Sequence, residues 1–244
     1  MFLEYYNIML EVQNMGNTTN NVLKILEAFT QSYIKKTKDI VDFKFGFMVD
    51  EVFYIVNIKC DGEFEVKEED RKDIFSFVTD SVTLNKLFAQ EITGMTAISR
   101  ANWKDAAPLD FVNYDRIPKN INFLRFIFSY FILGEPEKIT INKEHARIVH
   151  GGYAIPLIYD EGIRTAWYRV EKGMVINERE EDQFNPFPTF VIAKKGKGMI
   201  KIGLKKYVFQ DGDGYYIPKD TAHSFWTENE EGFEFIIIMY GEEA

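Results

Sequence analysis

Histidine and cysteine are scarce in this chain. Its 244 residues include three histidines, His145, His150 and His223, and one cysteine, Cys60. A single cysteine cannot form a disulfide within the chain and suits a reducing compartment. Three histidines give little material for an imidazole-based metal site, which needs three or four convergent ligands. The sequence also lacks a zinc-binding set of cysteines, a Ser-His-Asp arrangement and a glycine-rich phosphate loop.

Basic residues are outnumbered by acidic ones. Lysine and arginine total 29 against 38 aspartate and glutamate residues, which gives a net charge of −9 and a pI near 5.0. This balance disfavours nucleic acid or an anionic membrane surface as the main partner. The first ten residues are apolar but contain Glu4 and no basic segment, so we predict no secretion signal and a cytoplasmic location.

Long hydrophobic runs are missing as well. The most apolar segment, residues 122–133, spans about 18 Å as a helix, well short of the roughly 30 Å needed to cross a bilayer. We therefore predict no membrane span. A helix that is apolar on all sides is normally buried, and this one is expected to pack between two domains or in a homodimer interface. Gly134 ends it, which predicts domains at 1–134 and 135–244.

The first predicted domain mixes helices and strands. Helical spacing of apolar residues predicts a helix from Val22 to about Ile34. Phe43, Phe45 and Phe47 then alternate with polar residues and glycine, as in a strand with one aromatic face, and a hairpin signal follows at residues 61–62. These features predict an α+β domain with an antiparallel sheet. Further on, residues 73–78 are expected to form a strand and Asp80 or Ser81 to cap a helix, whereas residues 92–99 fit either state.

The order of these elements is similar to that of the sterol carrier protein family, which binds lipids. The similarity covers residues 21–111 and rests on the strand segments 45–49 and 54–58, the helix at 79–87, and Ala97. The glycines that follow this alanine in the family are absent. The resemblance implies an apolar tunnel for a lipid or sterol, which the three phenylalanines would line, although a plain aromatic core uses the same residues.

The second predicted domain consists of short strands with glycine-rich turns, as in a small β-barrel or sandwich. Its most informative segment is GDGYYIPKDTAHSF, residues 212–225, which predicts a short strand, a corner at Pro218 and a second strand that begins with His223. A histidine at this place points either into a barrel or into solvent, and the flanking strands favour the barrel.

This segment resembles the second motif of the cupin family. Gly212, Pro218 and His223 have the family's spacing, and Asp220 replaces its second glycine, a mild change because aspartate tolerates positive φ. The resemblance covers residues 143–244 and implies an all-β double-stranded β-helix barrel. Metal-binding cupins also carry a first motif, His-x-His followed by Glu. Counting from Gly173 puts Arg179 and Glu181 at the two histidine positions.

Counting back from Gly196 instead puts Gln183 and Asn185 there, with Thr189 at the glutamate position. Since neither count recovers a histidine, we predict a barrel without a catalytic metal, in which His223, amides and aromatic residues bind a ligand. The predicted ligand-binding residues are His223, Gln183, Asn185, Thr189, Tyr216 and Phe225. A buried histidine that only satisfies a structural hydrogen bond is the plainer alternative.

These features favour a non-catalytic cytoplasmic binding protein, with an apolar ligand in the first domain and a small polar ligand near His223. The alternative is a metal-dependent cupin enzyme, an isomerase or dioxygenase, with His223 and carboxylates of residues 178–182 as ligands to a divalent ion. A third hypothesis is an interaction module whose barrel mainly dimerises. We expect a homodimer, and the acidic run 178–182 to be a solvated loop.

Overall fold

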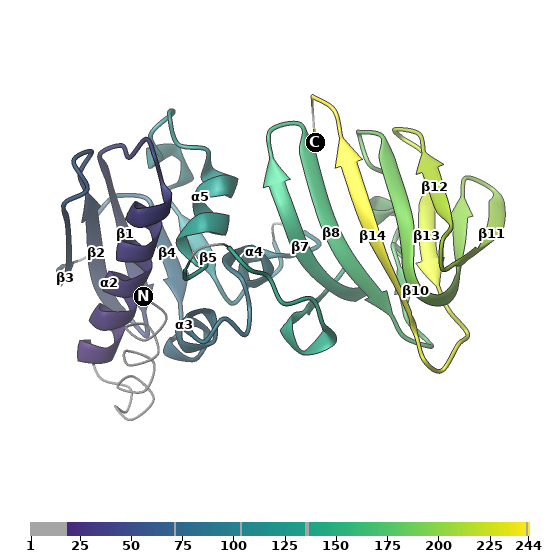
Figure 1. The fold of residues 1–244 in the computed structure, drawn as a ribbon, viewed down its shortest axis with the longest axis horizontal. Helices are drawn as coiled ribbons and strands as arrows, with labels where there is room; N and C mark the ends of the chain where they lie inside the picture. The colour runs from purple at the N-terminus through teal and green to yellow at the C-terminus, as the bar shows by residue number, and fades with distance from the viewer. Residues whose placement is uncertain (1–18, 71, 103, 135–136, 243) are drawn as a thin grey trace. The chain divides into compact units, whose positions relative to one another are not determined.

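The computed structural model describes residues 19–70, 72–102, 104–134, 137–242 and 244. The expectation for the first ten residues lies outside them. The chain divides into two compact units, an N-terminal one that ends at residue 139 and a C-terminal one that begins at residue 140 and also includes residues 99–105 (Figure 1). No helix among the described residues is long and apolar enough to span a membrane.

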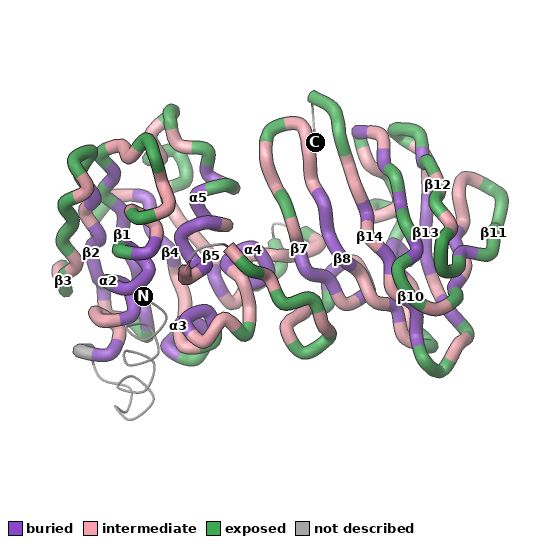
Figure 2. Tube along the Cα trace, in the orientation of Figure 1, coloured by how far each residue is buried: buried purple, intermediate pink, exposed green. Residues whose placement is uncertain are grey.

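A five-stranded mixed sheet forms the base of the N-terminal unit. Its strands run in the order β3-β2-β1-β4-β5, with β1 parallel to β4 and the other pairs antiparallel. The prediction of a purely antiparallel sheet is therefore wrong for one pair of strands. Strand β4 follows the β2–β3 hairpin in the chain and lies beside β1 in the same direction. Edge strand β3 is largely exposed (Figure 2). The strands are β1 Phe43–Val49, β2 Val52–Ile58, β3 Phe64–Glu68, β4 Ser76–Thr79 and β5 Asp110–Val112.

Four α-helices accompany this sheet: α2 Thr19–Lys36, α3 Ser81–Phe88, α4 Gly94–Ile98 and α5 Phe123–Tyr130, with a 3-10 turn at Tyr114–Arg116. The predicted cap of α3 is confirmed, since the Asp80 carboxylate accepts a hydrogen bond from the Thr83 backbone at 2.6 Å. The segment that the sequence left open, residues 92–99, contains the short helix α4. Asn122 caps α5 in the same manner as Asp80 caps α3.

Aromatic side chains fill the space between β1 and α5. Phe45 and Phe47 are fully buried, and the ring of Phe45 lies 5.3 Å from that of Phe126 and 5.4 Å from that of Tyr130. Each fully buried phenylalanine contributes about 1.5–3 kcal/mol. These rings form a packed aromatic core. Lipid or sterol binding by this unit stays a prediction.

Helix α5 also corrects the expected place of the apolar segment. Its buried residues pack against the sheet of its own unit, while Arg125 is exposed and forms an ion pair with Glu137 at 2.9 Å. Lys36 at the end of α2 interacts with the C-terminal end of α5. Its ammonium group donates to the carbonyl oxygens of Ser129, at 2.7 Å, and Ile132, and lies 3.5 Å from Glu137.

The C-terminal unit is a curled antiparallel sheet that contains no α-helix among its described residues (Figure 1). Its main path runs β6-β7-β8-β14-β10-β13-β9, with β11 and β12 also paired to β10. Its described residues also include 3-10 turns at Lys143–His145 and Glu180–Asp182. The strands are β6 Arg147–Val149, β7 Gly152–Asp160, β8 Ile163–Val170, β9 Val175–Ile176, β10 Thr189–Ile202, β11 Lys205–Gln210, β12 Gly214–Ile217, β13 His223–Trp226 and β14 Phe233–Tyr240.

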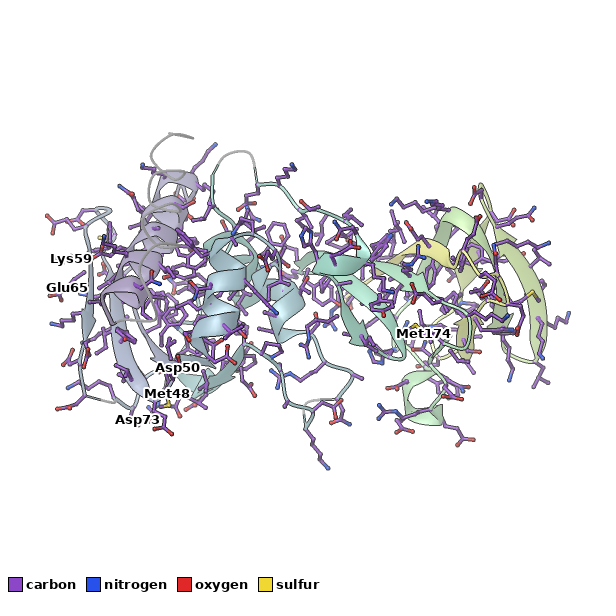
Figure 3. All side chains as sticks on the ribbon, turned by 90° about the horizontal axis from the view of Figure 1, so that it is seen from below. Met48, Asp50, Lys59, Glu65, Asp73 and Met174 are labelled. Carbon is purple, nitrogen blue, oxygen red and sulfur yellow. The ribbon has the colours of Figure 1, made fainter. Side chains whose placement is uncertain are left out.

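Strand β10 produces the curl. Its first part pairs with β12 on one side and β14 on the other, whereas its second part pairs with β11 and β13. The strand continues through a register shift after Ala193 and bends at Gly196, whose φ is +84°. The concave face buries Val191, Phe225 and Phe235, and Met174, labelled in Figure 3, packs against this core.

Removal of the Lys36 ammonium group should weaken the N-terminal unit. We expect Lys36→Met to lower its free energy of unfolding by about 2–4 kcal/mol, because two carbonyls and the carboxylate of Glu137 lose a buried partner. Hydrogen exchange of the α5 amides, followed by mass spectrometry, measures this loss. Lys35→Met, an exposed position on the same helix, is the control. Equal protection of α5 in the two variants would contradict the assignment.

A side chain at Gly196, where β10 bends, should destabilise the C-terminal unit. A Cβ atom on Gly196 would lie 2.7 Å from the carbonyl oxygen of Gly232, whereas Gly173 has nearly the same φ, +85°, with no atom within 4 Å. We expect Gly173→Ala to cost about 1–2 kcal/mol from backbone conformation alone. Gly196→Ala should cost about 1–3 kcal/mol more, because the backbone of β14 must move. Urea unfolding followed by the fluorescence of Trp167 and Trp226 compares them, and equal losses would rule out the close contact.

Candidate functional site

The corner between β12 and β13 positions His223. Pro218 follows β12, and Asp220 adopts a positive φ of 57°, the conformation that aspartate was expected to tolerate at this corner. The Asp220 amide donates to the carbonyl of Asn185 at 2.8 Å, and the amide of His223 donates to the carbonyl of Gln183 at 3.0 Å. Two backbone hydrogen bonds thus hold the corner against the segment that precedes β10.

The ring of His223 is buried and held in one tautomer. Only 2% of the residue is exposed. Its Nδ1 lies 2.9 Å from the carbonyl oxygen of Thr221, and because a carbonyl can only accept, Nδ1 carries the proton. In the neutral ring, Nε2 is then the acceptor. The Asn185 Nδ2 atom lies 3.5 Å away, too far for a strong hydrogen bond, so Nε2 keeps capacity for a further donor.

Burial lowers the pKa of His223, and the nearby His150 lowers it further, although the hydrogen bond to Thr221 acts in the opposite direction. The ring is therefore neutral at pH 7, since the usual histidine pKa is already about 6.5. A neutral imidazole with a free Nε2 can accept a hydrogen bond from a ligand or act as a base, whereas a protonated ring can do neither.

A cavity of about 230 Å3 adjoins this ring. Aromatic and aliphatic side chains from β8, β13 and β14 form one wall, and polar side chains from the turns form the rest. The wall follows from the pairing of β8 with β14, which places Tyr168 beside Phe235 and Arg164 beside Met239 on the concave face. The cavity is lined by Ala101, His150, Tyr159, Arg164, Tyr168, Ile176, Asn177, Glu181, Asp182, Phe184, Asn185, Phe187, His223, Phe225, Phe235, Ile237 and Met239.

Three of the predicted site residues, His223, Asn185 and Phe225, line this cavity. Thr189 is fully buried and serves the site indirectly, because its hydroxyl accepts a hydrogen bond from Asn185 Nδ2 at 3.1 Å. Gln183 turns its side chain to the carbonyl of Glu178, at 3.3 Å, and supports His223 only through its backbone.

The position of Tyr216 corrects the sequence hypothesis. It is 53% exposed and does not line the cavity, because its neighbour in β12, Ile217, takes the inward position and successive side chains of a strand face opposite sides. The ligand-binding role of the other predicted residues stays a prediction.

His150 lines the cavity although it was not among the predicted site residues. It lies in the turn between β6 and β7 with a positive φ of 53°, and its carbonyl accepts from the Asn177 amide at 2.9 Å. Its Nδ1 is 3.2 Å from the carboxylate of Asp182, close enough for an ion pair but not at the angle of a hydrogen bond. The pair of glycines after His150 was the available signal, because they mark a tight turn that directs the histidine.

The acidic residues at 178–182 differ in their exposure. Residues 178, 180 and 181 are exposed, as expected of a solvated loop. The side chain of Asp182 is only 10% exposed and lies between His150 and Arg179, whose Nε is 3.8 Å from it. One carboxylate of the run therefore lines the cavity, with His150 and Arg179 as its neighbours.

Arg164 is the other functional residue that the sequence argument missed. Its guanidinium group lies 5.4 Å from the ring centre of Phe187 and 5.9 Å from that of Tyr159. Its Nε is buried and has no hydrogen-bond partner among the described residues. Such an unpaired buried donor costs about 1–3 kcal/mol. The signal was a charge on the apolar face of β8, since alternation places Arg164 with Ala166, Tyr168 and Val170.

Burial also raises the pKa values of Tyr159 and Tyr168, so that both hydroxyl groups stay protonated near neutral pH. Neighbouring Asp182 and Tyr159 add to the rise at Tyr168, while the charge of Arg164 opposes it at Tyr159. Besides the carboxylate of Asp182, the polar part of the cavity therefore contains two neutral phenols, the neutral imidazole of His223 and the permanent cation of Arg164.

A bound metal ion does not fit the donors present. Within the described part of the chain, no three histidine, cysteine, aspartate or glutamate side chains gather closely enough to share an ion. The groups next to His223 Nε2 are an amide and aromatic rings, which are poor ligands for iron, manganese or zinc. We therefore derive no chemistry through a metal, and the expectation of a metal-free barrel stays a prediction.

Comparisons with solved structures find matches to part of the chain, several of which are named as cupin proteins. A protein from Photorhabdus luminescens matches 43% of this chain and 88% of its own at 19% identity, with a TM-score of 0.39. A cupin 2 conserved barrel domain protein from Salinispora arenicola matches 45% and 92% at 17% identity, with a TM-score of 0.40. A predicted oxalate decarboxylase from Thermotoga maritima matches 36% and 79% at 13% identity, with a TM-score of 0.33.

No protein-family model matches the chain, and a search of curated proteins finds no match either.

The lowered pKa of His223 predicts an acid-sensitive C-terminal unit. Because the unfolded state binds the proton more readily, stability is fully present above the unfolded pKa of about 6.5 and falls as the pH drops below it. We expect His223→Asn, whose amide can still donate to Thr221, to flatten this dependence. Urea unfolding between pH 7.5 and about 5.5, followed by tryptophan fluorescence, measures the slope.

His145→Asn, in the 3-10 turn outside the cavity, is the control. An unchanged slope in His223→Asn would show that the imidazole already titrates normally in the folded protein.

Proposed function

We propose that the C-terminal unit is a cupin-type barrel that binds a small organic molecule in the cavity beside His223, without catalysing a reaction on it. The observation that carries this proposal is the fixed tautomer of His223, which leaves Nε2 as an acceptor at the surface of a cavity. The spacing of Gly212, Pro218 and His223 supports the cupin assignment, together with the curled antiparallel sheet.

The chemistry of the cavity favours binding over catalysis. Covalent catalysis needs a nucleophile within reach of a base, and His223 has only backbone atoms, an amide and an aromatic ring as recorded partners. A binding site needs less: an apolar wall for most of the ligand surface and a few polar groups that fix its orientation. The wall of Phe225, Phe235 and Ile237 and the acceptor on His223 meet this requirement.

The cavity also limits the ligand. Its volume of about 230 Å3 lies below the roughly 300–1,000 Å3 of sites for drug-sized molecules. The ligand we propose is therefore small, with an O–H or N–H group that donates to His223 Nε2. The predicted homodimer, the cytoplasmic location and the absence of nucleic-acid partners remain proposals that size measurement and localisation can test.

Ligand capture tests this function. We expect native mass spectrometry of freshly purified protein, or a thermal-shift screen of small hydroxylated and amide compounds, to identify a molecule that binds the C-terminal unit. His223→Phe should weaken that binding about tenfold, which corresponds to the loss of one hydrogen bond of about 1.4 kcal/mol. Tyr216→Ala, on the outer face of the barrel, is the matched control and should leave the affinity unchanged.

Two results would contradict the proposal. If no compound co-purifies with the unit or stabilises it, the cavity is not a binding site. If elemental analysis finds near-stoichiometric iron, manganese, nickel or zinc that is lost in His223→Ala, the metal-dependent enzyme is the better assignment.

A further inference from the structure

Arg164 is a cation in the cavity wall for which no ion pair is recorded among the described residues. The pairing of β8 places it between Tyr159 of β7 and Met239 of β14, all three of which line the cavity. The rings of Tyr159 and Phe187 lie near its guanidinium group and restrict its movement. Arginine stays protonated at any physiological pH, so the charge is permanent.

The Nε atom of Arg164 is a buried hydrogen-bond donor. The atom has no hydrogen-bond partner among the described residues. Buried donors are almost always paired, which implies an acceptor that comes from outside the chain. A guanidinium group presents its N–H donors in a planar fork that matches the two oxygens of a carboxylate.

Among the described residues, no carboxylate forms an ion pair with Arg164. Asp182 lines the same cavity, but its two oxygens face the Nδ1 atom of His150, at 3.2 Å, and the Nε atom of Arg179, at 3.8 Å. Glu181 also lines the cavity, where it is exposed on the loop. The cation at Arg164 is therefore left for the ligand.

The apolar wall defines the rest of the ligand. Phe225 and Phe235 stack at 4.4 Å between ring centres, and Ile237 and Met239 continue the wall along β14 towards the position of Arg164. On the basis of the function proposed above, we infer that the cavity binds a small organic carboxylate, with its carboxylate group on Arg164 and its apolar body against this wall.

A series of probes with one shape and different charge tests the inference. We expect benzoate to bind the full-length protein at least about tenfold more tightly than benzamide, and benzylamine to bind more weakly than either. Hexanoate and hexanamide repeat the comparison with an aliphatic body. Isothermal titration calorimetry gives the affinities, and the ratio between acid and amide is the quantity that decides.

Arg164→Gln should remove this preference, so that benzoate and benzamide bind within about a factor of three of each other. Arg164→Lys keeps the charge and should retain part of the preference. Arg169→Gln is the matched control, because Arg169 lies on the same strand but faces the other side, where it pairs with Glu234 at 3.1 Å. It should leave the preference intact. Circular dichroism shows whether each variant is folded. If Arg164→Gln does not fold, the probe series on the unaltered protein still tests the inference.

The outcomes separate this inference from the function on which it rests. If benzamide or benzylamine binds as tightly as benzoate, or if the preference survives in a folded Arg164→Gln protein, the carboxylate assignment is wrong while the binding function stands. If none of the five probes binds, and the thermal-shift screen of neutral compounds also finds nothing, both are wrong.

Discussion

The hydrogen bond between His223 Nδ1 and the carbonyl of Thr221 determines what the C-terminal cavity can do. It assigns the proton to Nδ1, and burial of the ring keeps Nε2 unprotonated at neutral pH. Without that bond the ring could turn or change tautomer, and the cavity would present a donor in place of an acceptor. The amide of Asn185 and the phenols of Tyr159 and Tyr168 line the same cavity as this fixed acceptor.

The scaffold that holds the ring depends on the bend in β10. One strand belongs to both halves of the curled sheet, so a single chain segment sets the distance between the wall of β8 and β14 and the corner that carries His223. The close approach of Gly196 to Gly232 allows that bend. The charged groups then have different partners. Asp182 lies near His150 and Arg179, whereas no ion pair of Arg164 is found among the described residues and its guanidinium group lies near the rings of Tyr159 and Phe187. This separation gives the cavity a local polarity that the net charge of the chain does not suggest.

Local signals in the sequence were sufficient for most of the elements. Helix α2, the aromatic strand β1, the cap at Asp80 and the strand that opens with His223 all follow from periodicity or turn chemistry. The parallel pairing of β1 and β4 was missed because it joins segments distant in sequence. The packing of helix α5 against the sheet of its own unit was missed for the same reason, because the local sequence does not show which surface covers an apolar helix.

The candidate site was predictable only in part. His223, Asn185 and Phe225 were found from the spacing of one motif, but Tyr216 was assigned to the wrong face because the motif does not fix the strand alternation. His150 and Arg164 reach the cavity from segments outside the motif, through the β6–β7 turn and the register of β7 with β8. Such residues become visible only when the strand register is known.

The tautomer of His223 is the most direct test of this account. Nitrogen-15 NMR of the imidazole groups at pH 7 distinguishes protonated from unprotonated ring nitrogens, and three histidines make the spectrum simple to assign. The account predicts one neutral ring, missing from the spectrum of a His223 variant, with a proton on Nδ1 and none on Nε2. A proton on Nε2, or a doubly protonated ring, would contradict it.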